Sequence, residues 1–331
     1  MWQGLILCAA LTLAGQGLAR LPGISDSGVS PLVFALLLGI VVGNLPLGKH
    51  HDRAQPGLAF ATRWLLRGGI VLFGLSLTFA QVVGLGPKVL VLDTVIITAV
   101  LISGYLIGTR VLGMDRETTL LTSAGSAICG AAAVLATEST IRSRPAAASM
   151  AVATVVLFGS LSMLIYPLMY PWLGMDEGLF GVYIGATVHE VAQVVAAGDA
   201  VGPDALANAV IVKLVRVMLL VPFLLIVGQW WLKHHAAPDS GEGKAKLVIP
   251  WFAVGFIVMV GVNSLVSLPA PLHQGLVLAG QLALTMAMAA LGVNTRLERL
   301  KALGVKPFLL ALILFALLLG GGGLASIWVM G

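Results

Sequence analysis

The chain is built from long apolar segments that alternate with short stretches of proline, glycine and charged residues. An α-helix needs about 20 predominantly apolar residues to cross the hydrocarbon core of a bilayer, and these segments have that length. The composition agrees, because 59% of the 331 residues are hydrophobic and 10% are charged, whereas a soluble domain carries about 25% charged residues. The pattern predicts an all-α polytopic membrane protein whose surroundings are the lipid bilayer.

The positions of proline, glycine and charge divide the chain into eleven predicted transmembrane helices. The first lacks the basic region that begins a signal peptide, so we interpret it as a membrane helix. No soluble domain is predicted, since the longest polar connection, 233–246, is too short to form one. The predicted helices are 4–19, 31–46, 57–84, 87–109, 117–140, 146–170, 178–198, 205–232, 248–267, 272–295 and 306–329.

The Lys and Arg residues between the predicted helices indicate the orientation in the membrane. With eleven complete crossings, twelve of them fall on one side and four on the other. Because positively charged loops stay in the cytoplasm, this count predicts a cytoplasmic N-terminus and a periplasmic C-terminus. If segment 178–198 were re-entrant, the count would become five against eleven, so the orientation depends on that segment. The net charge of +5 comes from loop residues, and we expect no nucleic-acid partner.

The predicted helix 117–140 contains the run TSAGSAICGAAAVLATEST, which is too rich in Gly, Ser and Ala for an ordinary lipid-facing helix. A break at its middle leaves two arms, each about half a bilayer deep. The free N–H groups and the positive helix end at such a break form an anion site. The alternative is close helix packing through small residues. The residues expected at the site are Ser123, Gly125, Ser126, Cys129 and Gly130.

The run ATVHEVAQVVAAG, at 186–198, places ionisable side chains inside an apolar segment. Such residues are costly in a membrane, usually face the protein interior and often have a function. His189, Glu190 and Gln193 can converge on one side of a helix, because they are three and four residues apart. The alternative is a hydrogen-bonded cluster between helices. The string HEVAQ is not a zinc protease motif, since Gln193 stands where the second histidine ligand belongs, and no metal site is expected.

A basic pair follows in the next predicted helix, in the run KLVRVMLLVPFLL. Lys213 and Arg216 are three residues apart and need partners at that depth. Glu190 is the expected partner of Arg216, and a buried guanidinium is also a natural ligand for an oxyanion. The alternative is that both side chains extend to the membrane surface.

A third polar passage, QLALTMAMAALGVNT at 281–295, offers Gln281, Thr285, Gly292 and Asn294 within an apolar helix. It is a candidate for a second broken helix, and Asn294 is included among the candidate substrate ligands. Its signal is weaker than that of the Gly and Ser run.

At these residues the chain resembles the sulfate exporter family, the YeiH-like inner-membrane proteins of bacteria. The resemblance rests on GSAICGAAAVLATE, GATVHEVAQVVAAG, KLVRVMLLVPFL and AMAALGV, and it covers nearly the whole chain. The family is distantly similar to cation/proton antiporters and bile-acid-type anion transporters. This implies inverted five-helix repeats at 31–170 and 178–331 after an extra N-terminal helix within 1–30, with discontinuous helices 117–140 and 272–295 crossing at the midplane.

The sequence and the resemblance together predict a secondary active transporter of the bacterial inner membrane, and not an enzyme. Its expected substrate is a small inorganic sulfur oxyanion, sulfate or sulfite, and the expected direction is export. Glu190, with His189 or Glu138, is expected to carry the coupling ion, a proton or sodium. No nucleotide-binding motif occurs, and no cofactor is expected.

Two alternatives stay open at this stage. The same scaffold suits another small anion such as a carboxylate, because helix ends bind both kinds of ion. An intramembrane enzyme is the other, with Ser126 or Cys129 as nucleophile and His189 as base, although no catalytic signature surrounds these residues. The sequence also leaves the oligomeric state open, a homodimer included.

Overall fold

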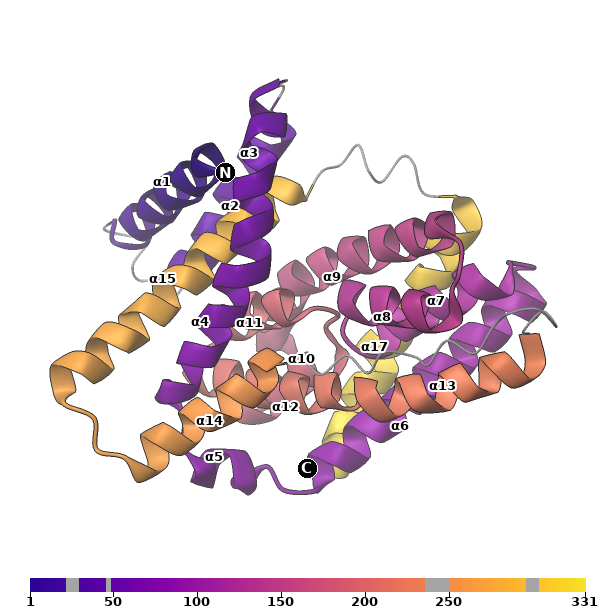
Figure 1. Cartoon of the computed structure of the whole chain (residues 1–331). Helices are drawn as coiled ribbons and strands as arrows, with labels where there is room; N and C mark the ends of the chain where they lie inside the picture. The colour runs from indigo at the N-terminus through magenta and orange to yellow at the C-terminus, as the bar shows by residue number, and fades with distance from the viewer. Residues whose placement is uncertain (22–29, 46–48, 236–250, 296–303) are drawn as a thin grey trace. The chain divides into compact units, whose positions relative to one another are not determined.

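The computed structural model describes residues 1–21, 30–45, 49–235, 251–295 and 304–331, and within these ranges its regular structure is entirely helical (Figure 1). Seven of the described helices are long and apolar enough to cross a membrane. The predicted class, an all-α membrane protein, is thereby confirmed, while the count of eleven helices and the orientation stay predictions. The seven are Trp2–Ala19, Arg53–Ser76, Lys88–Val111, Pro145–Leu173, Pro203–Trp231, Ala270–Asn294 and Val305–Met330.

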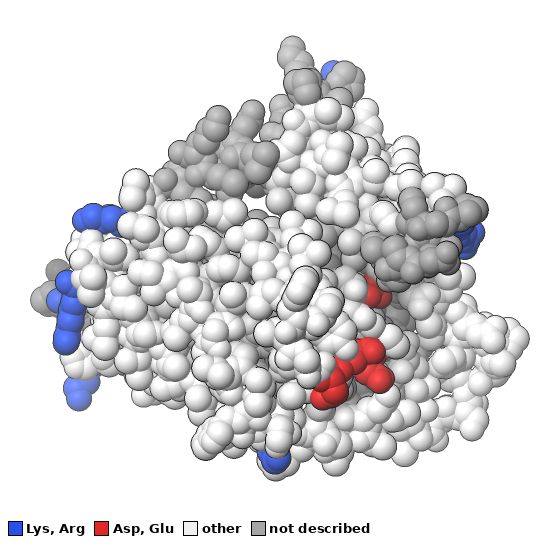
Figure 2. All heavy atoms as spheres, turned by 180° about the vertical axis from the view of Figure 1, so that it is seen from behind, with Lys and Arg blue, Asp and Glu red and all other residues white. Residues whose placement is uncertain are grey.

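The exposed surface is that of a protein surrounded by lipid. Large apolar side chains point outward, among them Trp172, which is 87% exposed, and Trp328, which is 85% exposed. On the face shown in Figure 2, most atoms belong to uncharged residues, and the Lys and Arg side chains in view lie near its edges. Such a surface would be unfavourable in water and is favourable in a bilayer.

The helices form two compact units, each assembled from three separate stretches of the chain. Met1–Gly86, Val195–Ala207 and Trp251–Glu298 make the first unit, and Pro87–Val194, Asn208–Pro250 and Arg299–Gly331 make the second. The units are therefore interleaved in sequence. The predicted division into 1–30, 31–170 and 178–331 describes structural repeats, whereas these two units are defined by which residues pack together. The predicted repeats therefore stay a prediction.

In the first unit, α2 and α15 pack closely through glycines. A Cβ on Gly292 would lie 2.9 Å from the Cα of Gly39 and still nearer to the carbonyl oxygen of Leu36, so these backbones approach as small residues allow in membranes. The helices of this unit are α1 (Trp2–Ala19), α2 (Pro31–Asn44), α3 (Lys49–Phe60), the π-helix η2 (Ala61–Leu65), α4 (Leu66–Phe73), the 3₁₀-helix η3 (Gly74–Ser76), α5 (Phe79–Gly84), α14 (Trp251–Leu265) and α15 (Ala270–Asn294).

The expectation of a second broken helix within 272–295 is wrong. Helix α15 runs without interruption from Ala270 to Asn294. Its polar residues have ordinary roles, since the hydroxyl of Thr285 donates to the carbonyl of Gln281, one turn back at 2.7 Å, and Gly292 serves the contact with α2.

The second unit contains the helices that position the candidate site. Its longest helix, α9, packs against α7, α8 and α17, and α6 packs against α7 and α17. Helices α11 (Val191–Asp199) and α12 (Pro203–Met218) contribute residues to both units. The other helices are α6 (Lys88–Leu106), the π-helix η4 (Ile107–Val111), α7 (Arg116–Ala127), α8 (Ala131–Ile141), α9 (Pro145–Leu173), α10 (Glu177–Thr187), α13 (Leu220–His235) and α17 (Val305–Met330).

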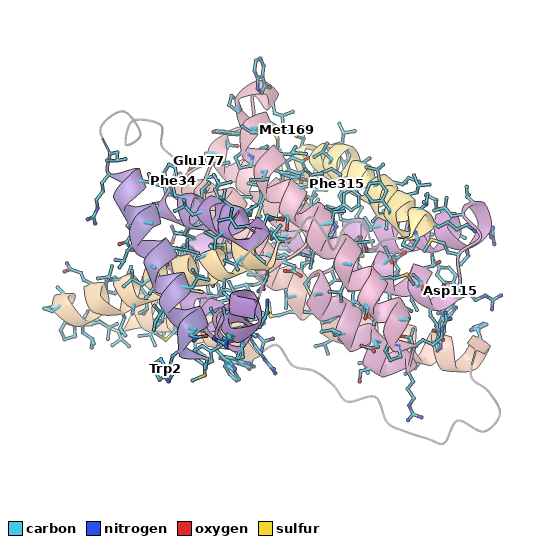
Figure 3. The ribbon with its side chains drawn as sticks, turned by 90° about the horizontal axis from the view of Figure 1, so that it is seen from above. Trp2, Phe34, Asp115, Met169, Glu177 and Phe315 are labelled. Carbon is cyan, nitrogen blue, oxygen red and sulfur yellow. The ribbon has the colours of Figure 1, made fainter. Side chains whose placement is uncertain are left out.

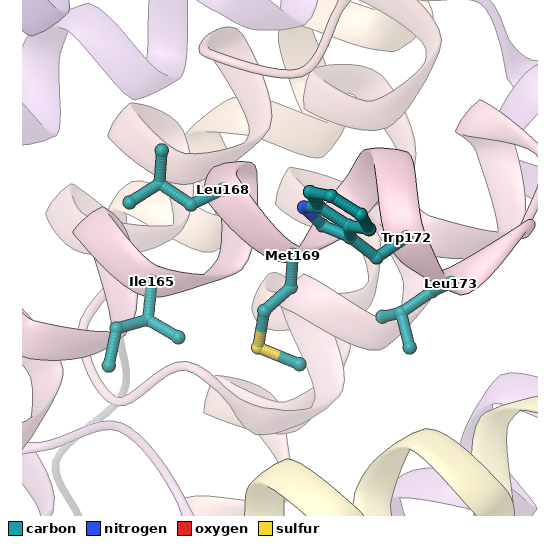
Figure 4. A pocket seen from close by; sticks show the side chains of 5 residues that line it. All are labelled: Ile165, Leu168, Met169, Trp172 and Leu173. Carbon is teal, nitrogen blue, oxygen red and sulfur yellow. The ribbon is translucent and has the colours of Figure 1, made fainter.

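A shallow pocket lies along α9 (Figure 4). Its lining is apolar throughout and includes no charged side chain, so it offers nothing that would hold an ion. The candidate site is therefore sought among the buried polar groups of the second unit. The pocket residues are Ile165, Leu168, Met169, Trp172 and Leu173.

Candidate functional site

The chain between α7 and α8 changes direction over three residues. Helix α7 ends at Ala127 and α8 begins at Ala131. Gly130 has φ +67° and ψ −134°, a conformation open essentially to glycine alone. Its N–H donates to the carbonyl of Gly125 at 2.9 Å. The carbonyls that follow, those of Ser126, Ala127 and Ile128, are left to side-chain donors.

A second interruption separates α10 from α11. Helix α10 ends at Thr187, Val188 is extended with ψ 143°, and α11 begins at Val191. The side-chain oxygen of Gln193 accepts the backbone N–H of Glu190 at 3.0 Å. This is the contact that the third residue of a helix makes with its N-cap in a capping box. The string Glu-Val-Ala-Gln was thus a helix-start signal within segment 178–198.

Both interruptions are joined by two cations from α12, and both cations are completely buried. The ammonium of Lys213 donates to the carbonyl of Ile128 at 2.6 Å and to that of Val188 at 2.7 Å. The carbonyls at the C-terminal ends of α7 and α10 carry partial negative charge, which a cation neutralises. Lys213 therefore holds the two chain breaks together.

Arg216 acts in the same way one turn further along α12. Its guanidinium donates to the carbonyl of Ala127 at 2.7 Å, to that of Ser126 at 3.4 Å and to that of Ala186. The expected pairing of Arg216 with Glu190 is not what the structure has, because the unsatisfied helix carbonyls are the nearer acceptors. Nor does either side chain extend to the membrane surface.

Glu190 contacts the N-terminal end of a helix, whereas Lys213 and Arg216 contact C-terminal ends. Its Oε1 accepts the backbone N–H of Ala131, the first residue of α8, at 3.2 Å. A carboxylate is favourable there, because a helix N-terminus carries free N–H groups and partial positive charge. Gly130 makes the approach feasible, since a Cβ at that position would lie 3.1 Å from Oε1 and closer still to Cγ.

The two broken helices enter the second unit from opposite sides. Figure 3 labels Asp115 and Glu177, which stand at the N-terminal ends of α7 and α10 and lie on opposite sides of this unit. Asp115 caps α7 by accepting the N–H of Thr118 at 3.0 Å. Burial opposes its ionisation, but that hydrogen bond and the nearby Arg144 prevail and hold the pKa of Asp115 below its usual value.

Asp93 is the residue that sequence reasoning missed. It lies in α6, is completely buried, and both of its carboxylate oxygens lack a hydrogen-bond partner. The positive charges of Arg216 and Lys213 attract it. A single acid within the apolar run KVLVLDTVIITAV was the signal, because an ionisable residue at bilayer depth is costly and is retained for a reason.

Three other candidate residues carry buried polar atoms without partners. These are the hydroxyl of Ser126, Nδ1 of His189 and Nε2 of Gln193. All three residues flank one of the two interruptions. Buried polar atoms are rarely left unpaired, so atoms of this kind indicate where a polar ligand would be satisfied.

The remaining candidates are placed elsewhere or are engaged within the fold. The hydroxyl of Ser123 donates to the carbonyl of Thr119 at 2.7 Å, and Cys129 is buried within the first break. Glu138 is partly exposed, about 10 Å further along α8 than its first residue. Asn294 belongs to the first unit, where its side-chain oxygen accepts from Gln55 at 3.3 Å.

The chain matches one family model and several bacterial membrane proteins. A family model described as Conserved hypothetical protein 698 matches residues 3–311. A UPF0324 membrane protein of Pseudomonas aeruginosa is 46% identical over 326 residues, 97% of this chain and 92% of that one. The UPF0324 inner membrane protein YeiH of Escherichia coli strain K12 is 44% identical over 322 residues, again 97% and 92% of the two chains.

Among solved structures, the chain is similar to the sodium proton antiporter of Methanocaldococcus jannaschii. The match covers 94% of this chain and 98% of that one, with 16% sequence identity. Its TM-score of 0.30 is too low to indicate a common fold.

Proposed function

We propose that this chain, which belongs to the UPF0324 family of YeiH-like membrane proteins, is a secondary active transporter. Its substrate is a small sulfur oxyanion, sulfite or sulfate, and export of that anion is coupled to the movement of a proton or a sodium ion across the membrane. The observation that carries the proposal is the pair of buried cations, Lys213 and Arg216, at the meeting point of two broken helices.

The charge at this point favours an anion. Lys213 and Arg216 are fully buried; both attract Asp93, and Lys213 also attracts Glu190. With both acids ionised the four formal charges cancel, and a proton on either acid leaves one unit of positive charge in a low-dielectric interior, where an anion is held more strongly than in water. The N-terminal ends of α8 and α11 add partial positive charge.

The cations retain donors for such a ligand. A guanidinium has five N–H donors and an ammonium three. Backbone carbonyls take three from Arg216 and two from Lys213. The spare donors, together with the unpartnered side-chain atoms of Ser126, His189 and Gln193, suit an anion with several acceptor oxygens.

The proposal assigns the remaining candidates by their positions. Gly125, Gly130 and Cys129 shape the first break. Glu190 and His189, beside the second break, are candidates for binding the coupling ion. Glu138 lies further along α8, so it would contact that ion only as the ion moves to or from the site. A small carboxylate is the competing substrate, because the same donors suit its oxygens.

The test is flux into liposomes that contain the purified protein. Labelled sulfite, sulfate and a small carboxylate are offered separately, with a pH gradient, with a sodium gradient and with neither. We expect gradient-dependent uptake of sulfite or sulfate, and at least a tenfold loss of it in Arg216→Gln. The matched control is Arg110→Gln, since Arg110 is exposed at the end of η4 and its replacement should leave flux unchanged.

Three results would decide against the proposal. Preferential uptake of the carboxylate would show that the substrate is a carboxylate and not a sulfur oxyanion. Full flux in a correctly folded Arg216→Gln protein would show that the anion does not bind at Arg216. Absence of uptake for every anion, with the protein shown to be monodisperse and inserted, would remove the transport function altogether.

A further inference from the structure

Asp93 differs from the other charged residues of the site because its side chain makes no hydrogen bond. Lys213 and Arg216 each donate to backbone carbonyls, and Glu190 accepts a backbone N–H. Asp93 is as completely buried as the two cations, yet neither of its oxygens has a hydrogen-bond partner. An ionised carboxylate in that state has lost its hydration without replacement, which is unfavourable unless a cation or a proton compensates.

Asp93 is not locked into an ion pair. Among the residues that the structure describes, the ion pairs within 4.0 Å are those of Arg144 with Asp115 and Glu117. The cations near Asp93 attract it at longer range, and their hydrogen bonds go to Ile128, Val188 and the other helix-end carbonyls. Removing the charge of Asp93 therefore breaks no hydrogen bond that holds the two broken helices together.

The charged groups that act on Asp93 are few. Helix α6 packs against α7, α17, α10 and η4. Their titratable residues stand near their own ends, except Tyr183, whose hydroxyl donates to the carbonyl of Leu319. The field at Asp93 is set by Lys213 and Arg216. The residues near the ends are Arg110, Arg116, Glu117, Glu177 and Lys306.

We propose that Asp93 is a proton-binding site of this transporter, loaded and emptied in step with the anion. The inference rests on the proposed function. A proton from water on one side binds the carboxylate and forms a neutral carboxylic acid, and the same proton leaves to water on the other side. No other bond forms or breaks, and the anion and the proton travel in the same direction.

The coupling follows from charge alone. When Asp93 takes up a proton, the formal charge of the four groups Asp93, Glu190, Lys213 and Arg216 together rises by one unit. At an effective dielectric constant of about 20, the attraction between unit charges about 8 Å apart corresponds to a change in binding of roughly 30-fold. Anion and proton thus favour each other's binding, as thermodynamic linkage requires.

A proton fits this site better than a metal cation does. A metal ion in a protein needs several oxygen ligands at once. Within the described part of the chain, no group of three or more His, Cys, Asp or Glu residues is arranged to hold one. Lys213 and Arg216 would also repel a sodium ion that reached Asp93, whereas a proton needs only one carboxylate oxygen.

The decisive variant is Asp93→Asn, which keeps the size of the side chain and removes its titration. Asp176→Asn is the matched control, because Asp176 is an exposed N-cap and asparagine caps a helix equally well. Each protein is assayed in liposomes for sulfite counterflow, which needs no net proton movement, and for sulfite accumulation driven by a pH gradient. We expect Asp93→Asn to retain counterflow within about threefold and to lose accumulation, while the control keeps both.

The outcomes separate the proton site from the transport function. Normal accumulation in Asp93→Asn would overturn the inference, and so would loss of counterflow in a folded variant, since that would make Asp93 structural. Counterflow in the wild type without any response to pH would overturn the inference and leave the transport function standing. Absence of counterflow in the wild type would remove both.

A second measurement covers the case in which Asp93→Asn does not fold. Infrared difference spectra of the wild-type protein, with and without sulfite, report whether a carboxylic acid is formed when the anion binds. A protonated carboxyl band that appears with sulfite and shifts in heavy water supports the site. No such band across the pH range of anion binding contradicts it.

Discussion

Replacing Gly159 by alanine tests how the second chain break is held in place. Gly159 lies on α9, and an added Cβ would lie 2.5 Å from Cδ and 2.6 Å from Nε2 of Gln193, with Oε1 closer still. These atoms form the end of a side chain, so the amide of Gln193 moves and the backbone does not need to. Displacement of this amide removes the hydrogen bond that Gln193 accepts from the N–H of Glu190 at 3.0 Å.

The size of the effect follows from two opposing contributions. Loss of the partner of a partly buried N–H costs about 1–2 kcal/mol. Alanine in place of glycine inside a helix gains up to about 1 kcal/mol. Gly320→Ala in α17 isolates that gain, because nothing lies within 4 Å of a Cβ at position 320. Gly159→Ala should therefore be less stable than Gly320→Ala by about 1–2 kcal/mol.

The assay is thermal unfolding of both variants in the same detergent, followed by tryptophan fluorescence. The expected difference is a midpoint lower by about 2–6 °C for Gly159→Ala. Anion flux should fall in the same variant, since Glu190 and the start of α11 are no longer fixed. Equal midpoints and equal fluxes in the two variants would show that the contact between Gln193 and Glu190 does not support the break.

Two further predictions concern the other contacts that shape the site. Lys213→Met leaves two buried carbonyls without their donor, at about 1–3 kcal/mol each, so its unfolding midpoint should fall well below that of the exposed control Lys88→Met, and equal midpoints would refute the capping role. Asp115→Ala should cost about 1 kcal/mol, because it removes the N-cap of α7. The folded pKa of Asp115 is lowered by the N–H of Thr118 and by Arg144 against the effect of burial; its stabilisation is therefore present above the unfolded pKa, near 3.9, and disappears as pH falls through the folded pKa. Acid titration of unfolding midpoints checks this, since the gap between wild type and Asp115→Ala should begin to close as pH falls below about 4, and a constant gap would contradict it.

The polar residues of the site were largely visible in the sequence because each stands out locally. His189, Lys213 and Arg216 are ionisable residues in apolar runs, and the lone acid Asp93 carried the same signal without being singled out. The interruption before α11 was harder to see, since neither glycine nor proline marks it. Its signal was the spacing of Glu190 and Gln193, which is that of a helix start.

The wrong expectation at 272–295 has a physical explanation. A glycine in a membrane helix permits either a break or a close contact with a neighbouring helix, and the sequence alone looks the same in both cases. Gly130 adopts a positive φ and allows a break, whereas Gly292 stays helical and lies against Leu36 and Gly39. What distinguishes them is the neighbouring backbone, which comes from elsewhere in the chain.

The amino-acid sequence alone is enough to identify an all-α membrane protein and the family to which it belongs. The hydrophobicity of a segment is the sum over its own residues, so a bilayer-spanning helix can be identified without knowing which other helices pack against it. It is the packing of the helices that makes Lys213 and Arg216 cap the carbonyls of two broken helices and leaves Asp93 unbonded. Their partners at the first break lie 85 and 89 residues away in sequence, and which carbonyls need a donor depends on where each helix ends in the packed protein.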